Sequence, residues 1–142
     1  VGALVEFGNG MVGTLEACRT IVGPKSQFAF EWHGSGGALG WDHERLNELN
    51  LYKPTDDGTD DGFIRVLGGD KYPHHGSFVP GDGNAIGYED LKVIEVLEFL
   101  RSIAAGRQHV PGFAEALAVA EVCAAIARSW ESGGWETVTK IG

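Results

Sequence analysis

One glycine-rich stretch, residues 68–87 (GGDKYPHHGSFVPGDGNAIG), combines several side chains that are suited to bind hydroxyl groups or move protons. Two neighbouring histidines, two aspartates and an asparagine lie inside it, and a tyrosine follows it at once. The candidate residues are His74, His75, Asp82, Asn84 and Tyr88. Imidazole, carboxylate, amide and phenol groups all form hydrogen bonds with hydroxyl groups. Two hypotheses stay open: these groups line a site for a polyhydroxylated ligand, or they decorate a solvated loop.

A metal site is the less favoured hypothesis for the two histidines. Adjacent side chains point apart in an extended chain, and no third histidine or cysteine lies at the spacing of a zinc site. The acidic stretch DDGTDDG offers oxygen ligands for calcium. An EF-hand loop that began at Asp57 would need a glutamate at its twelfth position, however, where Gly68 stands. We therefore expect no metal ligand in this chain.

The stretch GSGGALG, residues 34–40, resembles the start of a dinucleotide-binding loop, but its spacing is wrong. The third glycine comes one residue late, and WDHE follows where such a loop needs the first turn of a helix. We predict a reverse turn between two strands, and no binding of NAD by this chain alone. Ser35 lacks the helix that follows a hydrolase nucleophile, so we assign no catalytic residue within the chain.

Composition is typical of a globular domain. The chain has 142 residues, 43% apolar and 22% charged, which suffices for one domain with a core. Its net charge of −9 argues against a nucleic-acid partner, and its apolar runs are far shorter than the roughly 20 residues that span a bilayer. Cys18 and Cys123 are predicted to be buried and unpaired, which fits a cytoplasmic protein. Val1 already stands in an expected strand, so we expect a piece of a longer protein.

The elements that must position the candidate residues follow from periodicity. Asn9-Gly10 predicts a two-residue hairpin loop that pairs Phe7 with Val12 and Leu4 with Leu15. Alternating and helical patterns predict the remaining elements. These are strands near residues 27–33, 46–53, 62–67 and 135–141, and helices over residues 88–106 and 113–134.

Strands followed by helices indicate an α+β domain over residues 1–142, with an open, largely antiparallel β-sheet. Two helices can pack on only one face of such a sheet. The other face is then available for a partner, and we expect oligomerisation through it.

Several stretches, in their order along the chain, resemble the C-terminal domain of the Gfo/Idh/MocA oxidoreductases, the group that includes glucose–fructose oxidoreductase and inositol dehydrogenase. The resemblance covers essentially the whole sequence. It rests on the hairpin FGNGMVGTLE, the turn GSGGALGWD, the sequence GYED leading into the helix EFLRSI, and the closing SWESGGWETV.

This resemblance implies an NAD(P)-dependent oxidoreductase whose N-terminal Rossmann domain, absent from this chain, holds NAD or NADP and the catalytic lysine. The substrate implied is a sugar, polyol or inositol-like compound. The present domain would bind that substrate through His74, His75, Asn84 and Tyr88, with Asp82 a weaker candidate, and would form a homo-oligomer. Relatives often have histidine at the position of Asn84 and Tyr-Tyr in place of His74-His75, so substrate choice depends on these positions. The alternative is a non-catalytic dimerisation module with no substrate pocket of its own.

Overall fold

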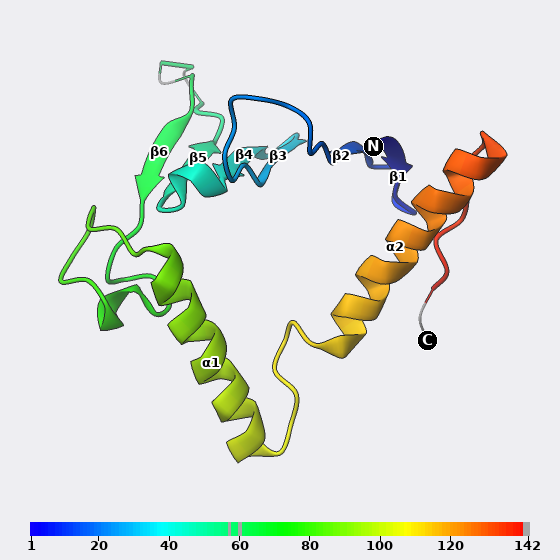
Figure 1. Ribbon diagram of the computed structural model, residues 1–142. Helices are drawn as coiled ribbons and strands as arrows, with labels where there is room; N and C mark the ends of the chain where they lie inside the picture. Colours follow the sequence, from blue (N-terminus) through cyan, green and yellow to red (C-terminus); the bar gives the residue numbers. More distant parts are fainter. Residues whose placement is uncertain (57, 60, 141–142) are drawn as a thin grey trace. The chain divides into compact units, whose positions relative to one another are not determined.

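The computed structural model describes every residue except 57, 60, 141 and 142. The chain divides into two compact units, which are Val1–Ile21 with Glu98–Gly142, and Val22–Leu97 (Figure 1). The described part contains two helices and open antiparallel sheets of two and four strands, so the predicted α+β class is confirmed. The strands are β1 (Gly2–Glu6), β2 (Val12–Glu16), β3 (Ala29–Gly34), β4 (Gly37–Asp42), β5 (Glu48–Tyr52) and β6 (Ile64–Leu67). The helices are α1 (Tyr88–Ala105) and α2 (Phe113–Ser132), with short 3-10 turns η1 (His43–Arg45) and η2 (His75–Ser77).

The unit formed by Val22–Leu97 is built on the four-stranded sheet β3-β4-β5-β6, in which every neighbouring pair is antiparallel. The predicted turn in GSGGALG is confirmed, because Gly34 pairs with Gly37 across a two-residue connection between β3 and β4. Gly37 has a φ of 138°, and a Cβ atom there would overlap the carbonyl oxygen of Tyr52. The residues after the turn form strand β4, so no helix N-terminus stands there to receive a phosphate.

The two faces of this sheet differ sharply in polarity. Side chains alternate along each strand, and the register aligns the apolar ones across all four strands. The apolar face carries Phe30, Trp32, Leu39, Trp41, Leu49, Leu51, Ile64 and Val66. The opposite face carries the polar residues Glu31, His33, Glu48, Asn50 and Arg65 together with Tyr52 and Leu67, and Arg65 Nη1 lies 3.7 Å from Glu48 Oε2 there in an ion pair.

The predicted register of the β1–β2 hairpin is wrong by one residue. Leu4 lies opposite Thr14, and Phe7 pairs with Met11 through a backbone bond of 2.8 Å from Phe7 N to Met11 O. The connection is a three-residue loop in which Gly10 takes a φ of 84°. A three-residue loop with glycine in the left-handed conformation is a known alternative to the two-residue turn, and the Asn9 Oδ1 stabilises it by accepting from Met11 N at 3.1 Å.

Both helices match the predicted ranges within two residues, and Gly133, with a φ of 69°, ends α2 as expected. The predicted closing strand does not form over Trp135–Lys140, and Ile141 lies outside the described residues. This segment instead returns to the end of α2, where Arg128 Nη2 donates to the Thr137 carbonyl at 3.1 Å. Neither helix in the described part is long and apolar enough to cross a membrane.

The expectation of buried cysteines is also wrong, because Cys18 and Cys123 are both exposed, and both are free thiols. Apolar neighbours in the sequence do not tell which side of an element is covered, and this is the physical reason for the error.

Candidate functional site

The loop of residues 68–87 connects β6 to α1 and closes on itself at its base. Gly68 N donates to the Asn47 carbonyl at 2.8 Å, and Gly83 N donates to the Gly68 carbonyl at 2.9 Å. Near the other end, the Asn47 side chain bonds the backbone of Ile86, whose side chain is only 6% exposed. These bonds give a loop without regular periodicity a fixed base on the four-stranded sheet.

The two histidines lie at the turn η2 in the middle of this loop. His74 caps the turn with a φ of 69°, a left-handed conformation that is uncommon for a residue with a side chain. The imidazole of His75 lies against Gly68 and edge-on to the Tyr72 ring, with ring centroids 6.3 Å apart. His75 Nε2 is buried without a hydrogen-bond partner in the described structure, and Nδ1 lies 3.5 Å from the Pro73 carbonyl.

Asp82 and Asn84 occupy the second half of the loop in different ways. Asp82 packs directly over Gly69, where a Cβ atom would overlap its carboxylate, and its Oδ2 lies 3.4 Å from Lys71 Nζ. The Asn84 side chain turns back into the loop, because its Nδ2 donates to the Gly81 carbonyl at 3.2 Å. Asp82 therefore keeps a carboxylate at the surface, whereas one N–H donor of the Asn84 amide is used in a hydrogen bond within the loop.

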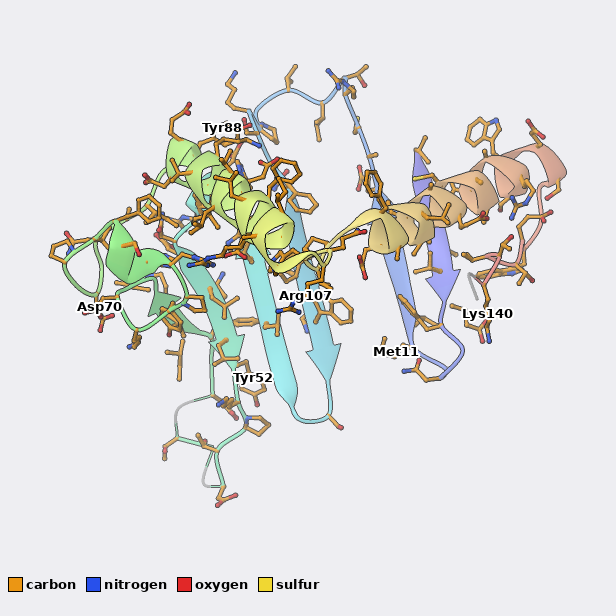
Figure 2. All side chains as sticks on the ribbon, turned by 90° about the horizontal axis from the view of Figure 1, so that it is seen from below. Met11, Tyr52, Asp70, Tyr88, Arg107 and Lys140 are labelled. Carbon is orange, nitrogen blue, oxygen red and sulfur yellow. The ribbon has the colours of Figure 1, made fainter. Side chains whose placement is uncertain are left out.

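Tyr88 lies at the start of helix α1 (Figure 2) and contacts a second group of side chains. Its ring meets the imidazole of His43 edge-on, with centroids 6.3 Å apart, and Lys92 Nζ lies 5.4 Å from the ring centroid. Tyr88 as a whole residue is 57% exposed. The turn η1 thus supports one side of Tyr88, and a cation from the next helical turn supports another.

Of the five predicted residues, the structure brings His75 and Asp82 together and places Tyr88 among other neighbours. His75 and Asp82 pack on the successive glycines 68 and 69, so an imidazole and a carboxylate share one backbone segment. Tyr88 is held by His43 and Lys92 instead. Sequence reasoning missed these two supporting residues and also Asn47. The i,i+4 spacing on the predicted helix could have revealed Lys92, whereas His43 and Asn47 depend on the pairing of distant segments.

Shallow hollows also lie along the β1–β2 hairpin and beside residues 59 and 61–64. Across the described residues, no group of three or more His, Cys, Asp or Glu side chains is placed to hold a metal ion.

Comparison with known proteins gives similarity over nearly the whole chain. Levoglucosan dehydrogenase of Pseudarthrobacter phenanthrenivorans is 33% identical over 141 residues, which are 99% of this chain and 36% of that protein. The chain therefore spans about a third of the length of the curated relative that it matches. No protein-family model matches it.

Solved structures agree with this similarity. A levoglucosan dehydrogenase in complex with NADH and levoglucosan superposes with a TM-score of 0.91 at 33% identity, covering 99% of this chain and 38% of the other. An NAD binding oxidoreductase from Klebsiella pneumoniae gives a TM-score of 0.88 at 35% identity over 97% of this chain and 37% of the other. An oxidoreductase domain protein from Kribbella flavida gives 0.89 at 33% identity over 96% and 36%.

Proposed function

We propose, on the premise that this chain matches the C-terminal part of a Gfo/Idh/MocA-type oxidoreductase, that it is the substrate-binding and oligomerisation domain of an NAD(P)-dependent sugar or polyol dehydrogenase. The resemblance carried by its sequence motifs is confirmed by that match. The single observation that carries the proposal is similarity along 99% of the chain to proteins solved with NADH and a sugar. In this proposal, residues 1–142 form one domain, and a Rossmann domain outside the chain holds the cofactor.

The chain's own contribution is to orient the substrate. The bound nicotinamide of the parent protein would supply the hydride chemistry. Asp82 presents a carboxylate that accepts from a sugar hydroxyl, and the Tyr88 phenol can both donate and accept. The imidazoles at 74 and 75 and the amide of Asn84 complete the proposed set. Orientation matters because moving a reacting carbon by about 1 Å can cost on the order of 100-fold in rate.

The test uses the complete reading frame that encodes this chain, assayed with NAD and levoglucosan. We expect His75→Ala and Tyr88→Phe each to lower kcat/KM by about tenfold or more, because each removes a group that orients the sugar. Asn50→Ala, on the polar face of the sheet, is the matched control and keeps full activity. An unchanged kcat/KM in both site variants would exclude these residues from the pocket.

Cofactor binding by the chain alone is checked separately. Titration calorimetry of residues 1–142 with NAD should give no heat of binding, because residues 34–40 turn between two strands and offer no helix N-terminus. Measurable affinity would overturn the assignment of the cofactor to another domain. The exposed free thiols are compatible with a reducing compartment, and we place the parent protein in the cytoplasm.

A second candidate function is a dimerisation module with no substrate pocket of its own. The observation in its favour is the apolar face of the four-stranded sheet, on which Trp32 and Ile64 are 53% and 59% exposed. One domain can serve both functions, so the two proposals are tested independently.

A further inference from the structure

We propose that Asn47 is the positioning residue that sets the conformation of the 68–87 loop and, with it, the placement of the candidate sugar-binding side chains. The part that concerns the sugar rests on the proposed function. The part that concerns the loop rests on the geometry alone.

Asn47 bonds both ends of the loop at once. Its backbone carbonyl accepts from Gly68 N at 2.8 Å. Its side chain bonds the same residue twice, because Nδ2 donates to the Ile86 carbonyl at 2.8 Å and Oδ1 accepts from Ile86 N at 2.9 Å. Residues 39 positions apart in sequence are joined in this way, and Asn47 links Gly68 to Ile86 in addition to the direct bond from Gly83 N to the Gly68 carbonyl.

Asn47 is itself held in place by the turn that precedes β5. The Trp41 indole donates from Nε1 to the Leu46 carbonyl at 3.0 Å, and Asp42 Oδ1 accepts from Glu44 N at 2.9 Å to cap η1. Strand β4 pairs with β5 directly beside this turn, with Trp41 opposite Leu49. The side chain of Asn47 therefore projects from a hydrogen-bonded turn directly before β5.

The bonds of Asn47 hold both ends of the loop, and a candidate site residue lies next to each end. Ile86 precedes Tyr88 by two residues, and Gly87 N donates to Asp90 Oδ2 at 2.7 Å, so the start of α1 continues directly from the fixed backbone. At the other end, Gly68 forms the surface on which the His75 ring lies. Loss of the Asn47 side chain would free the Ile86 end while leaving the Gly68 end bonded to a backbone carbonyl.

Asparagine is suited to this position because its amide offers a donor and an acceptor together. Aspartate at 47 keeps the acceptor for Ile86 N but loses the donor to the Ile86 carbonyl. Alanine loses both. These two variants therefore predict different patterns of protection for the same backbone amide.

The first experiment measures amide hydrogen exchange by NMR on this chain, unchanged and with Asn47→Ala, Asn47→Asp or Asn50→Ala. We expect exchange at Ile86 N to quicken by about tenfold in Asn47→Ala, since a hydrogen bond to a buried residue is lost. Asn47→Asp should retain most of this protection. Gly68 N should stay protected in every variant, and Asn50→Ala should match the unchanged chain. The proposal would be overturned if Ile86 N in Asn47→Ala were as protected as in the unchanged chain. It would also be overturned if both Asn47 variants lost protection equally at Ile86 and throughout the sheet.

The second experiment uses the protein encoded by the complete reading frame, with NADH bound, titrates levoglucosan and follows the NMR signals of Tyr88 and His74. We expect the apparent Kd to rise by about tenfold in Asn47→Ala and to recover in part in Asn47→Asp, because the binding groups are no longer pre-positioned. An unchanged Kd in Asn47→Ala, despite lost protection at Ile86, would refute the link from loop to sugar. Absence of any shift in the unchanged complete protein would count against the proposed function, while the exchange data still decide whether Asn47 holds the loop.

Discussion

Single glycines decide the backbone path of the hairpin between β3 and β4. Gly37 takes a φ of 138°, which side chains of L-residues rarely adopt, and its Cα hydrogen faces the Tyr52 carbonyl on the neighbouring strand. Gly36, its neighbour in the same turn, has open space around it and an ordinary φ. The glycines that resemble a phosphate-binding loop thus have separate structural roles, and only Gly37 is required by both conformation and space.

This difference predicts that Gly37→Ala destabilises the chain and Gly36→Ala does not. The alanine at 37 combines backbone strain with a clash, so we expect the free energy of unfolding to fall by about 1–3 kcal/mol. The control variant Gly36→Ala should stay within about 0.5 kcal/mol of the unchanged chain. Urea denaturation followed by tryptophan fluorescence measures both. Equal stability of the two variants would contradict this account of the turn.

The residue types of the candidate site follow from the sequence, but their partners do not. The sequence of residues 68–87 places imidazole, carboxylate and amide groups in one segment. It cannot show that the Asn84 side chain donates to the Gly81 carbonyl, nor that Asn47, in the turn before β5, bonds Ile86. A hydrogen bond between residues 39 positions apart depends on how the 68–87 loop folds back beside that turn, and no local amino-acid pattern encodes this.

Secondary structure was predictable where local chemistry specifies it. The β3–β4 turn and both helices follow from glycine spacing and a 3.6-residue period. The β1–β2 register was not, because Gly8-Asn9-Gly10 is compatible with two loop lengths that differ by one residue. The alternating Trp135–Lys140 segment has strand propensity, but a strand also needs a partner edge, and the end of α2 binds this segment instead.

Helix α2 carries a pH-dependent contribution to stability at its first turn. Gly112 N donates to Glu115 Oε2 at 2.7 Å, and this bond together with the Glu115 backbone amide lowers the pKa of the Glu115 carboxyl. A lowered pKa in the folded state means that the stabilisation is fully present above the pKa of the unfolded chain. It is lost as the pH falls through the folded value.

We therefore expect the unfolding free energy of the unchanged chain to decline more steeply below about pH 4.3, the ordinary glutamate pKa, than that of Glu115→Gln. Glutamine keeps an oxygen acceptor for Gly112 N but cannot titrate. Glu121→Gln on the same helix is the control and should follow the unchanged chain. Circular dichroism during urea titrations between acid and neutral pH provides the comparison, and parallel curves for all three proteins would contradict the assignment.

At the scale of the whole molecule, net charge and exposed apolar surface have opposite effects on association between copies of this chain. The sequence carries a net charge of −9, which opposes contact between copies at low ionic strength. The unit Val22–Leu97 nevertheless exposes aromatic and branched side chains on one face of its sheet, where burial would be favourable at about 25 cal/mol per Å². Salt screens the charge repulsion between copies but does not remove the favourable free energy of burying apolar surface. Association through this face should therefore strengthen as ionic strength rises.

We expect light scattering to show a mass that increases with protein concentration and with salt, and Trp32→Glu to return the chain to a monomer. Trp32 lies on the apolar face of the edge strand β3, so a carboxylate there would be buried without a partner in the dimer. His33→Glu adds the same group one residue along the strand, on the opposite face, and should leave the mass unchanged. A monomer at every concentration and salt level would rule out pairing of this chain through the sheet. Equal dissociation by both variants would instead assign the effect to added charge, because both variants place a carboxylate on the same strand.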